Sequence, residues 1–240
     1  MEIRFKDYVI QTQLPTSWNE DSKFVINTIN PHSYCIAEED PEFKQALTSS
    51  DILLPDGVGI VWASRFMYGA KIRKVAGYDL HLHFLELLNQ QSGKVFYLGS
   101  TDSTLQKIQL RLQSDYPNIE FHCYSPPFKP LMDDQDNAHI HQIINKVKPQ
   151  ILFVGMTAPK QEKWVHQNKD SLDVEVICSI GAVFDFYSGN VKRPSKIWID
   201  LGLEWLPRLL NEPKRLWRRT FISSPKFLLY LISSKFSTSS

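Results

Sequence analysis

The chain has 240 residues, of which 42% are hydrophobic and 22% charged, which is typical of a globular protein able to bury a full core. Three widely spaced cysteines without a C-x-x-C pair argue against a disulfide framework and a cysteine-rich zinc site. The N-terminus shows no basic leader followed by an apolar stretch, and no segment reaches the ~20 apolar residues that span a bilayer. We therefore expect a cytoplasmic protein.

Charge is unevenly distributed along the chain, although the net charge is only +1. Residues 191–240 carry 10 Lys and Arg against 3 Asp and Glu, whereas residues 1–190 carry 17 against 23. A mildly acidic body of net charge −6 is thus followed by a basic tail of net charge +7. This change predicts two units, a core over 1–190 and an appendage over 191–240.

Short apolar segments alternate with amphipathic segments through the body. The expected strands are FVINTI (24–29), DILL (51–54), KVFYLG (94–99), IEFHCY (119–124), QILFVGM (150–156) and EVICSIG (175–181). The expected helices cover 41–49, 57–68, 78–91, 102–115, 134–147 and 158–169. This alternation predicts an α/β fold with a mostly parallel sheet flanked by helices.

In such a sheet, ligands bind beyond the carboxyl ends of the strands, so polar groups at strand-to-helix junctions are candidate site residues. The stretch LLPDGVGIVWASR (53–65) places a lone carboxylate, Asp56, after an apolar strand and before two glycines. An aspartate there can cap the following helix, or it can act as a catalytic group at the carboxyl ends of the strands. A dinucleotide fingerprint would need a third glycine at Trp62, which disfavours a nicotinamide-dependent oxidoreductase.

Two further patterns contain residue types that can bind a metal, but each is better explained by its place in a helix. DDQD (133–136) contains D-x-D, but acidic residues in the first turn of a helix also favour its dipole. HLH (81–83) and HIH (139–141) hold histidines two residues apart, which point to different sides of a helix. We predict no metal site at these positions.

The segment GMTAPKQE (155–162) places a glycine, small residues and polar side chains at the start of a helix. Free N–H groups there favour anions, and Gln161 can offer both a donor and an acceptor to a sugar or a uracil edge. The alternative is a capping segment with a solvated Lys–Glu surface. Both interpretations remain open from the sequence.

The tail interleaves aromatic, leucine and basic residues, and prolines at 207, 213 and 225 predict several short helices within it. Three of the six tryptophans lie there: Trp198, Trp205 and Trp217. This composition suits helices lying in a membrane interface, with cations meeting anionic head groups. The alternative is a helical hairpin packed on the body with solvated arginines.

Seven motifs, in order from about residue 24 to 219, resemble the WecG/TagA/CpsF glycosyltransferase family. They are TIN (28–30), PDGVGIV (55–61), KVAGYDL (74–80), VFYLGS (95–100), GMTAPKQEKW (155–164), IGAVFDFYSGNVKRP (180–194) and GLEWLPRLLNEPKRLWRR (202–219). The resemblance implies a Rossmann-like fold without the usual D-x-D metal dependence, so neither a metal nor another cofactor is expected.

The resemblance also implies a reaction. A sugar, typically N-acetylmannosamine or its uronate, passes from a UDP donor to a sugar on undecaprenyl diphosphate. Such reactions build teichoic acid linkage units, enterobacterial common antigen, and capsular or exopolysaccharides. Inversion needs one base to take the proton of the acceptor hydroxyl, and Asp56 matches the family's proposed base. The lipid acceptor implies a peripheral protein on the inner face of the bacterial cytoplasmic membrane.

Other site residues are carried over from the resemblance. The substrate-binding positions are Thr28, Asn30, Lys74, Gln161, Arg193, Arg208, Arg215 and Arg218. The tail arginines are expected to close over the site and to stabilise the departing diphosphate. At Lys74 the family usually has arginine, and lysine keeps the charge but loses bidentate geometry, so an altered donor preference is expected.

Three other function classes compete with this prediction. In a non-catalytic membrane-surface nucleotide-binding module, the tail would carry the function at the membrane, and the body would serve as its scaffold. The oxidoreductase is already disfavoured, and the acidic body argues against binding of nucleic acid. An anionic membrane surface is an expected partner, and exposed apolar surface around the tail also predicts a homo-oligomer.

Overall fold

The sheet predicted from the sequence is present in the computed structural model, which describes residues 2–18 and 23–237. Residues 196, 200, 211, 215 and 234–237 are described by their backbone only. Six strands form one parallel sheet in the order β4-β3-β8-β7-β5-β6. They are β3 (Phe24–Ile29), β4 (Ile52–Pro55), β5 (Lys94–Gly99), β6 (Glu120–Tyr124), β7 (Ile151–Gly155) and β8 (Val176–Ser179). The predicted α/β class with a mostly parallel sheet is confirmed.

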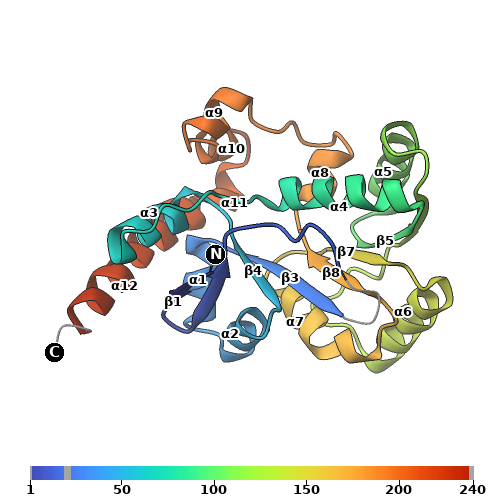
Figure 1. The fold of residues 1–240 in the computed structure, drawn as a ribbon, viewed down its shortest axis with the longest axis horizontal. Helices are drawn as coiled ribbons and strands as arrows, with labels where there is room; N and C mark the ends of the chain where they lie inside the picture. The colour runs from blue at the N-terminus through green and yellow to red at the C-terminus, as the bar shows by residue number, and fades with distance from the viewer. Residues whose placement is uncertain (1, 19–22, 238–240) are drawn as a thin grey trace.

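Helices follow the strands as the alternation predicts (Figure 1). In the body they are α1 (Pro31–Ala37), α2 (Pro41–Thr48), α3 (Val58–Tyr68), α4 (Gly77–Gln91), α5 (Asp102–Asp115), α6 (Asp134–Val147), α7 (Lys160–Asn168) and α8 (Val183–Tyr187). Several begin at a side-chain cap, such as Asp40 for α2 and Thr101 for α5. The alternation in the sequence did not predict α1, α8 or an antiparallel hairpin of β1 (Glu2–Phe5) and β2 (Tyr8–Gln11).

Side chains that alternate along β7 point into two hydrophobic cores, one on each face of the sheet. Ile151 and Phe153 face a cluster with α4, α5 and α8, whereas Leu152 and Val154 face a cluster with α6 and α7. All four are fully buried, as expected for a parallel strand covered on both faces. Helices therefore cover both faces and leave the carboxyl ends of the strands as the place for a ligand.

The tail forms α9 (Lys196–Asp200), α10 (Trp205–Asn211), α11 (Pro213–Trp217), the π-helical segment η2 (Arg218–Ser223) and α12 (Ser224–Ser237). Each proline lies in the first turn of its helix, where the missing N–H costs little. The predicted short helices are thus confirmed. Figure 1 shows α9 and α10 at the top of the view and α12 beside α3.

The end of the tail is packed on the body. Phe227 and Leu231 of α12 are buried in a third core with α1, α3 and the hairpin. The ring of Phe227 lies 5.2 Å from that of Tyr34, and Ser223 Oγ is 2.8 Å from His32 Nδ1. A packed appendage is therefore correct for this part of the tail. Within the described part of the chain, no helix is both long and apolar enough to cross a membrane.

Candidate active site

A small polar cavity of about 160 Å³ lies where β3, β4 and β8 end and where α4 and α7 begin. Six of the residues predicted from the sequence line it: Thr28, Asn30, Asp56, Gln161, Arg193 and Arg208. Further polar residues, which were not predicted from the sequence, also line it: Ser33, Tyr78, Glu162, Ser179, Glu204 and Arg219. Segments from residue 28 to residue 219 thus meet around one cavity.

Asp56 reaches this cavity from the end of β4. Its backbone N–H donates to Ile29 O at 2.8 Å, so the turn after β4 continues the pairing with β3. The following helix, α3, begins at Val58 with Gly57 as its N-cap and without a side-chain cap, so the alternative that Asp56 is a helix cap is wrong. Gly57 has φ of +88°, which favours glycine, and a Cβ at Gly59 would lie 2.4 Å from Pro31 Cγ. The two glycines allow this turn and the close packing of α3.

The surroundings of Asp56 raise the pKa of its carboxyl group. Burial is the largest cause, and Glu204 adds repulsion. Arg219, Lys74 and Arg208 oppose the increase by stabilising the charged form. A carboxylate with a raised pKa is a stronger proton acceptor once it is ionised, which suits a general base.

Three buried side chains beside Asp56 hold polar atoms without a hydrogen-bond partner in the described structure. These atoms are Gln161 Oε1, Glu162 Oε2 and Ser179 Oγ, and the side chains are 4%, 5% and 2% exposed. Gln161 Nε2 donates to Glu162 Oε1 at 2.9 Å, and burial raises the pKa of Glu162 to about 7. Buried polar atoms usually have partners, so this set indicates a site for a polar ligand.

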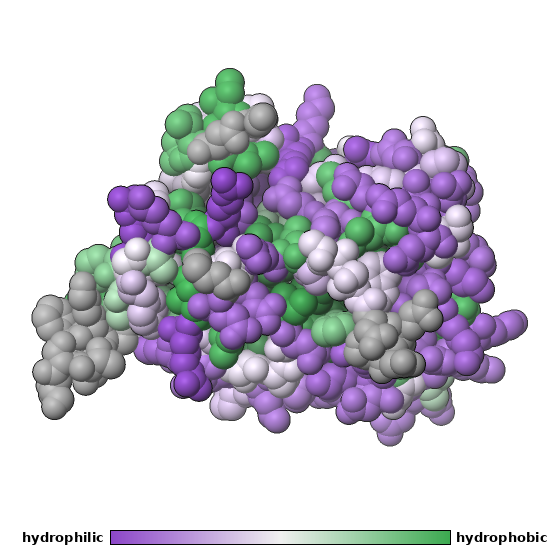
Figure 2. All heavy atoms as spheres, in the orientation of Figure 1, coloured by the Kyte–Doolittle hydropathy of each residue, from purple (hydrophilic) through white to green (hydrophobic). Residues whose placement is uncertain are grey.

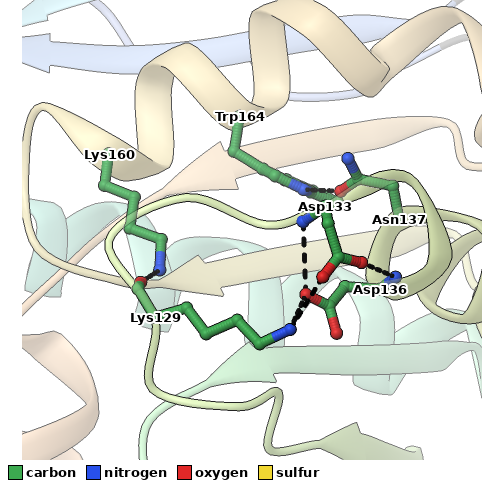
Figure 3. Close-up of polar contacts among 6 residues, drawn as sticks. All are labelled: Lys129, Asp133, Asp136, Asn137, Lys160 and Trp164. Carbon is green, nitrogen blue, oxygen red and sulfur yellow. Dashed lines mark hydrogen bonds and ion pairs between the residues drawn. The ribbon is translucent and has the colours of Figure 1, made fainter.

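The structure at the start of α7 decides between the two interpretations of GMTAPKQE. Glu162 is buried at the cavity, so a solvated Lys–Glu surface is wrong for that residue. Lys160 turns away from the cavity, and its ammonium group donates to Lys129 O (Figure 3). Gln161 and Glu162 are the polar residues of this segment that line the cavity.

Cations approach the cavity from the C-terminal part of the chain. Arg193 pairs with Asp79 at 3.0 Å and stacks on the ring of Tyr78 at 4.4 Å. Arg208 lies 5.2 Å from the ring centroid of Phe186 on α8. Arg219 lies on η2 and has the largest charge effect on Asp56.

The remaining predicted residues lie differently. Lys74 does not itself line the cavity, but it pairs at 2.8 Å with Glu204, which does. Arg218 is exposed and does not line the cavity, whereas its neighbour Arg219 does. The side chain of Arg215 lies outside the described residues.

Asn30 has a structural task as well as a place at the cavity. Its Oδ1 accepts hydrogen bonds from His32 N at 3.0 Å and Ser33 N at 3.1 Å, which caps α1. Ser33 Oγ accepts from Asn30 N at 2.8 Å and completes a capping box. Because of this cap, replacing Asn30 would perturb α1 as well as the cavity.

The acidic motif DDQD forms the start of α6 rather than part of the cavity (Figure 3). Asp133 caps the helix, and Asp136 closes a capping box with it. Lys129 Nζ lies 2.8 Å from Asp133 Oδ2 and 2.7 Å from Asp136 Oδ2, so a lysine ammonium group balances the two carboxylates. This arrangement agrees with the helix-dipole interpretation of the motif.

The paired histidines serve the packing of helices. His81 is fully buried, its Nε2 lies 2.6 Å from Tyr97 Oη, and burial lowers its pKa to about 3. His83 Nε2 contacts Pro15 O at 2.7 Å, and His141 Nε2 lies 2.8 Å from Asn168 Oδ1. The members of each pair point to different neighbours, as their spacing predicts.

A model of the glycosyl transferase WecG/TagA/CpsF family matches residues 4–240. The chain belongs to this family. It is therefore a WecG/TagA/CpsF glycosyltransferase, and the family resemblance of its seven motifs is confirmed.

Similar proteins share one name, N-acetylglucosaminyldiphosphoundecaprenol N-acetyl-beta-D-mannosaminyltransferase. The protein of Bacillus subtilis strain 168 is 33% identical over 88% of this chain and 80% of its own length. That of Bacillus spizizenii is 32% identical over 90% and 82%. That of Staphylococcus aureus strain MW2 is 29% identical over 88% and 80%.

Proposed function

We propose that this glycosyltransferase moves N-acetylmannosamine, or a related hexose or uronate, from a UDP donor to a sugar on undecaprenyl diphosphate, with inversion. The acceptor class is supported by the names of the relatives above. The donor is supported by the resemblance of the motifs. The observation that carries the proposal is Asp56, a carboxylate with a raised pKa in a cavity that also holds unpaired polar groups and arginines.

The proposed mechanism uses Asp56 as the base. It takes the proton of the acceptor hydroxyl while the oxygen attacks the anomeric carbon, on the face opposite the departing UDP. A single carboxylate suffices because no covalent sugar–enzyme intermediate is needed. Gln161, Glu162 and Ser179 offer hydrogen-bonding groups to the donor, because each holds a buried atom without a partner.

Stabilisation of the departing diphosphate is assigned to Arg193 and Arg208. Both line the polar cavity and both are contributed by the tail. Preorganised cations of this kind act where negative charge develops in the transition state. Arg219 has the largest charge effect on Asp56, and we assign it to the acceptor side of the cavity.

We place the enzyme on the inner face of the cytoplasmic membrane, where it would contribute to a cell-envelope polymer. Eleven of the eighteen exposed large apolar side chains of the described residues lie beyond residue 190. Figure 2 shows apolar side chains gathered over α9 and α10. Apolar groups beside lysines and arginines suit an anionic bilayer surface.

A donor screen tests the proposal. Purified enzyme is given UDP-sugars and a synthetic polyprenyl-diphosphate N-acetylglucosamine, and the anomeric configuration of the product is read by NMR. We expect transfer with inversion, highest with UDP-N-acetylmannosamine or a close relative. Binding of UDP-sugar without transfer to any acceptor would instead support the non-catalytic nucleotide-binding module.

A further inference from the structure

A second and larger cavity, here called the apolar groove, lies between α3 and the tail. Its volume is about 710 Å³, within the range of ligand-binding cavities. Its wall is mainly apolar and includes Trp62 and Phe66 of α3, Phe221 of η2, and Leu228 and Ile232 of α12. These five side chains are 47–65% exposed, so the groove presents apolar surface to solvent. Apolar surface of this extent marks a binding site more often than a chance feature.

The apolar groove and the polar cavity share a wall. Glu204, Arg208 and Arg219 line both of them. A ligand that crossed this wall would therefore meet three environments in sequence: polar groups around Asp56, then two guanidinium groups and the carboxylate of Glu204, which Lys74 balances at 2.8 Å, then apolar side chains. A sugar, a diphosphate and a hydrocarbon chain have the same order in a lipid-linked sugar.

We propose that the apolar groove binds the first isoprene units of the polyprenyl chain of the acceptor. The diphosphate then lies beside Arg219 at the shared wall, and the sugar points toward Asp56. This inference rests on the proposed function, because it takes a lipid-linked sugar as the acceptor. Charge complementarity selects this occupant, because a diphosphate brings two negatively charged groups to the guanidinium groups of Arg208 and Arg219, whereas a neutral hydrocarbon or an apolar protein segment brings none.

The tail is already anchored elsewhere, which leaves the groove open for a ligand. Phe227 and Leu231 turn into the core formed with α1 and the hairpin. Both also border the groove, and Leu228 and Ile232, one position further along α12, line it with side chains that are 56% and 47% exposed. The same helix thus anchors the tail and forms one wall of the groove.

Binding of farnesyl diphosphate tests the proposal directly, with inorganic diphosphate as the reference ligand. Isothermal titration is done with the full chain in detergent-free buffer. We expect farnesyl diphosphate to bind at least about tenfold more tightly than diphosphate, because apolar surface is buried. Equal affinity of the two ligands would overturn the proposal.

Two neighbouring leucines of α12 provide a matched pair of variants. Leu228 lines the groove and is 56% exposed, whereas Leu229 is 68% exposed and does not line it. Leu228→Gln should remove most of the farnesyl advantage, and Leu229→Gln should keep it. Trp62→Gln, on the opposite wall, should act like Leu228→Gln. Equal behaviour of the two leucine variants would overturn the proposal.

Other occupants of the groove give different results. If the groove instead inserts into the bilayer, Leu228→Gln weakens binding to phosphatidylglycerol vesicles but leaves farnesyl diphosphate affinity unchanged. If a second copy of the chain covers it, Leu228→Gln shifts a dimer to a monomer in sedimentation and again leaves that affinity unchanged. Either result would overturn the proposal.

Transfer assays separate this proposal from the proposed function. The KM for sugar-diphosphate acceptors with one to four isoprene units is measured with the preferred donor. We expect the KM to fall as the chain lengthens in the wild type but not in Leu228→Gln. Transfer with a KM independent of chain length would overturn the proposed binding of the polyprenyl chain in the groove, but not the proposed function. Farnesyl diphosphate binding that is sensitive to Leu228, without any transfer, would overturn the proposed function, but not binding of the chain in the groove.

Discussion

The body and the tail contribute different charges to the polar cavity. Among the described side chains that line it, the body supplies the carboxylates of Asp56 and Glu162 and the amide of Gln161, whereas the tail supplies three arginines and one carboxylate, that of Glu204. The unequal charge of the two parts, −6 and +7, therefore meets at the cavity. This difference teaches that Asp56 and Glu162 are positioned by the sheet and the helix that follows β7, while the arginines depend on docking of the tail.

The two parts are also held in different ways. Asp56 follows a strand whose neighbours pair with it along a fixed register. Arg219 is positioned by a helical segment that is anchored through Phe227, Leu231 and the contact between Ser223 and His32. Substitutions in the body should therefore remove a group from a fixed frame, whereas substitutions in the tail should change stabilisation of negative charge at the cavity and affinity for anionic surfaces.

Asp56→Asn should have the largest effect. Removal of the base is expected to lower kcat by about 10²–10⁴-fold while the melting temperature stays close to that of the wild type. In the wild type, kcat/KM should rise with pH through the raised pKa of Asp56, because only the ionised carboxylate accepts a proton. Asp102→Asn, in the first turn of α5, is the control and should retain activity. A folded Asp56→Asn enzyme with near-normal kcat would contradict the assignment.

Glu162→Gln should change the pH dependence of stability. The folded pKa of about 7 exceeds the ordinary value of 4.5, so the folded state holds a proton that the unfolded state releases. The free energy of unfolding of the wild type should therefore fall as pH rises from about 4.5 to about 7, by about 3 kcal/mol, and then level off. Glutamine is neutral throughout and should lack this fall.

Urea unfolding of both proteins at pH 5 and pH 8 measures the difference. Both proteins share the other titrating groups, so subtracting one profile from the other isolates Glu162. Parallel profiles would show that the carboxyl group is not held neutral in the folded protein.

Arg219→Ala tests the contribution of the tail to the reaction, with the neighbouring Arg218→Ala as the comparison. Loss of a charged hydrogen-bond donor at the cavity should lower kcat/KM for the lipid-linked acceptor by about 2 kcal/mol, or roughly thirtyfold. Arg218→Ala removes the same charge from an exposed position and should cost less than about threefold. Steady-state kinetics at a saturating donor concentration compare the two. Equal losses would mean that charge alone, rather than position, explains the effect.

Lys214→Gln should give the smallest effect and bears on the membrane surface. Lys214 is exposed on α11, so its loss should weaken binding to phosphatidylglycerol vesicles by about 1 kcal/mol. Lys146→Gln, at an exposed position of α6 in the body, is the matched control and should leave binding unchanged. Vesicle binding by the wild type should also decrease as salt rises. Equal weakening by both variants would contradict a role specific to the tail.

Much of the architecture follows from local sequence. The alternation of apolar strands with amphipathic helices predicted all six parallel strands, and the position of Asp56 after β4 predicted its place at the ligand edge. The hairpin β1–β2 was missed because its burial depends on residues far away in the chain, such as Tyr34 and Phe227. Short strands of this kind carry little signal of their own.

The motif at residues 202–219 did not by itself predict which of its last three arginines lines the cavity. Arg215, Arg218 and Arg219 are equally basic in sequence, and the π-helical segment η2 changes the direction in which successive side chains point. Glu162 was likewise missed as a site residue, because a charged residue beside a lysine suggests a solvated surface. Its burial results from packing at the start of α7, which only the assembled fold reveals.

Attachment of residues 191–222 at both ends has a consequence for assembly of the polar cavity. This segment continues from the core at one end and is anchored by α12 at the other. Its guanidinium groups are therefore held near the cavity, at an effective concentration in the millimolar range or above. Assembly of the cavity is intramolecular, so the fraction of protein with these groups in place should not depend on protein concentration.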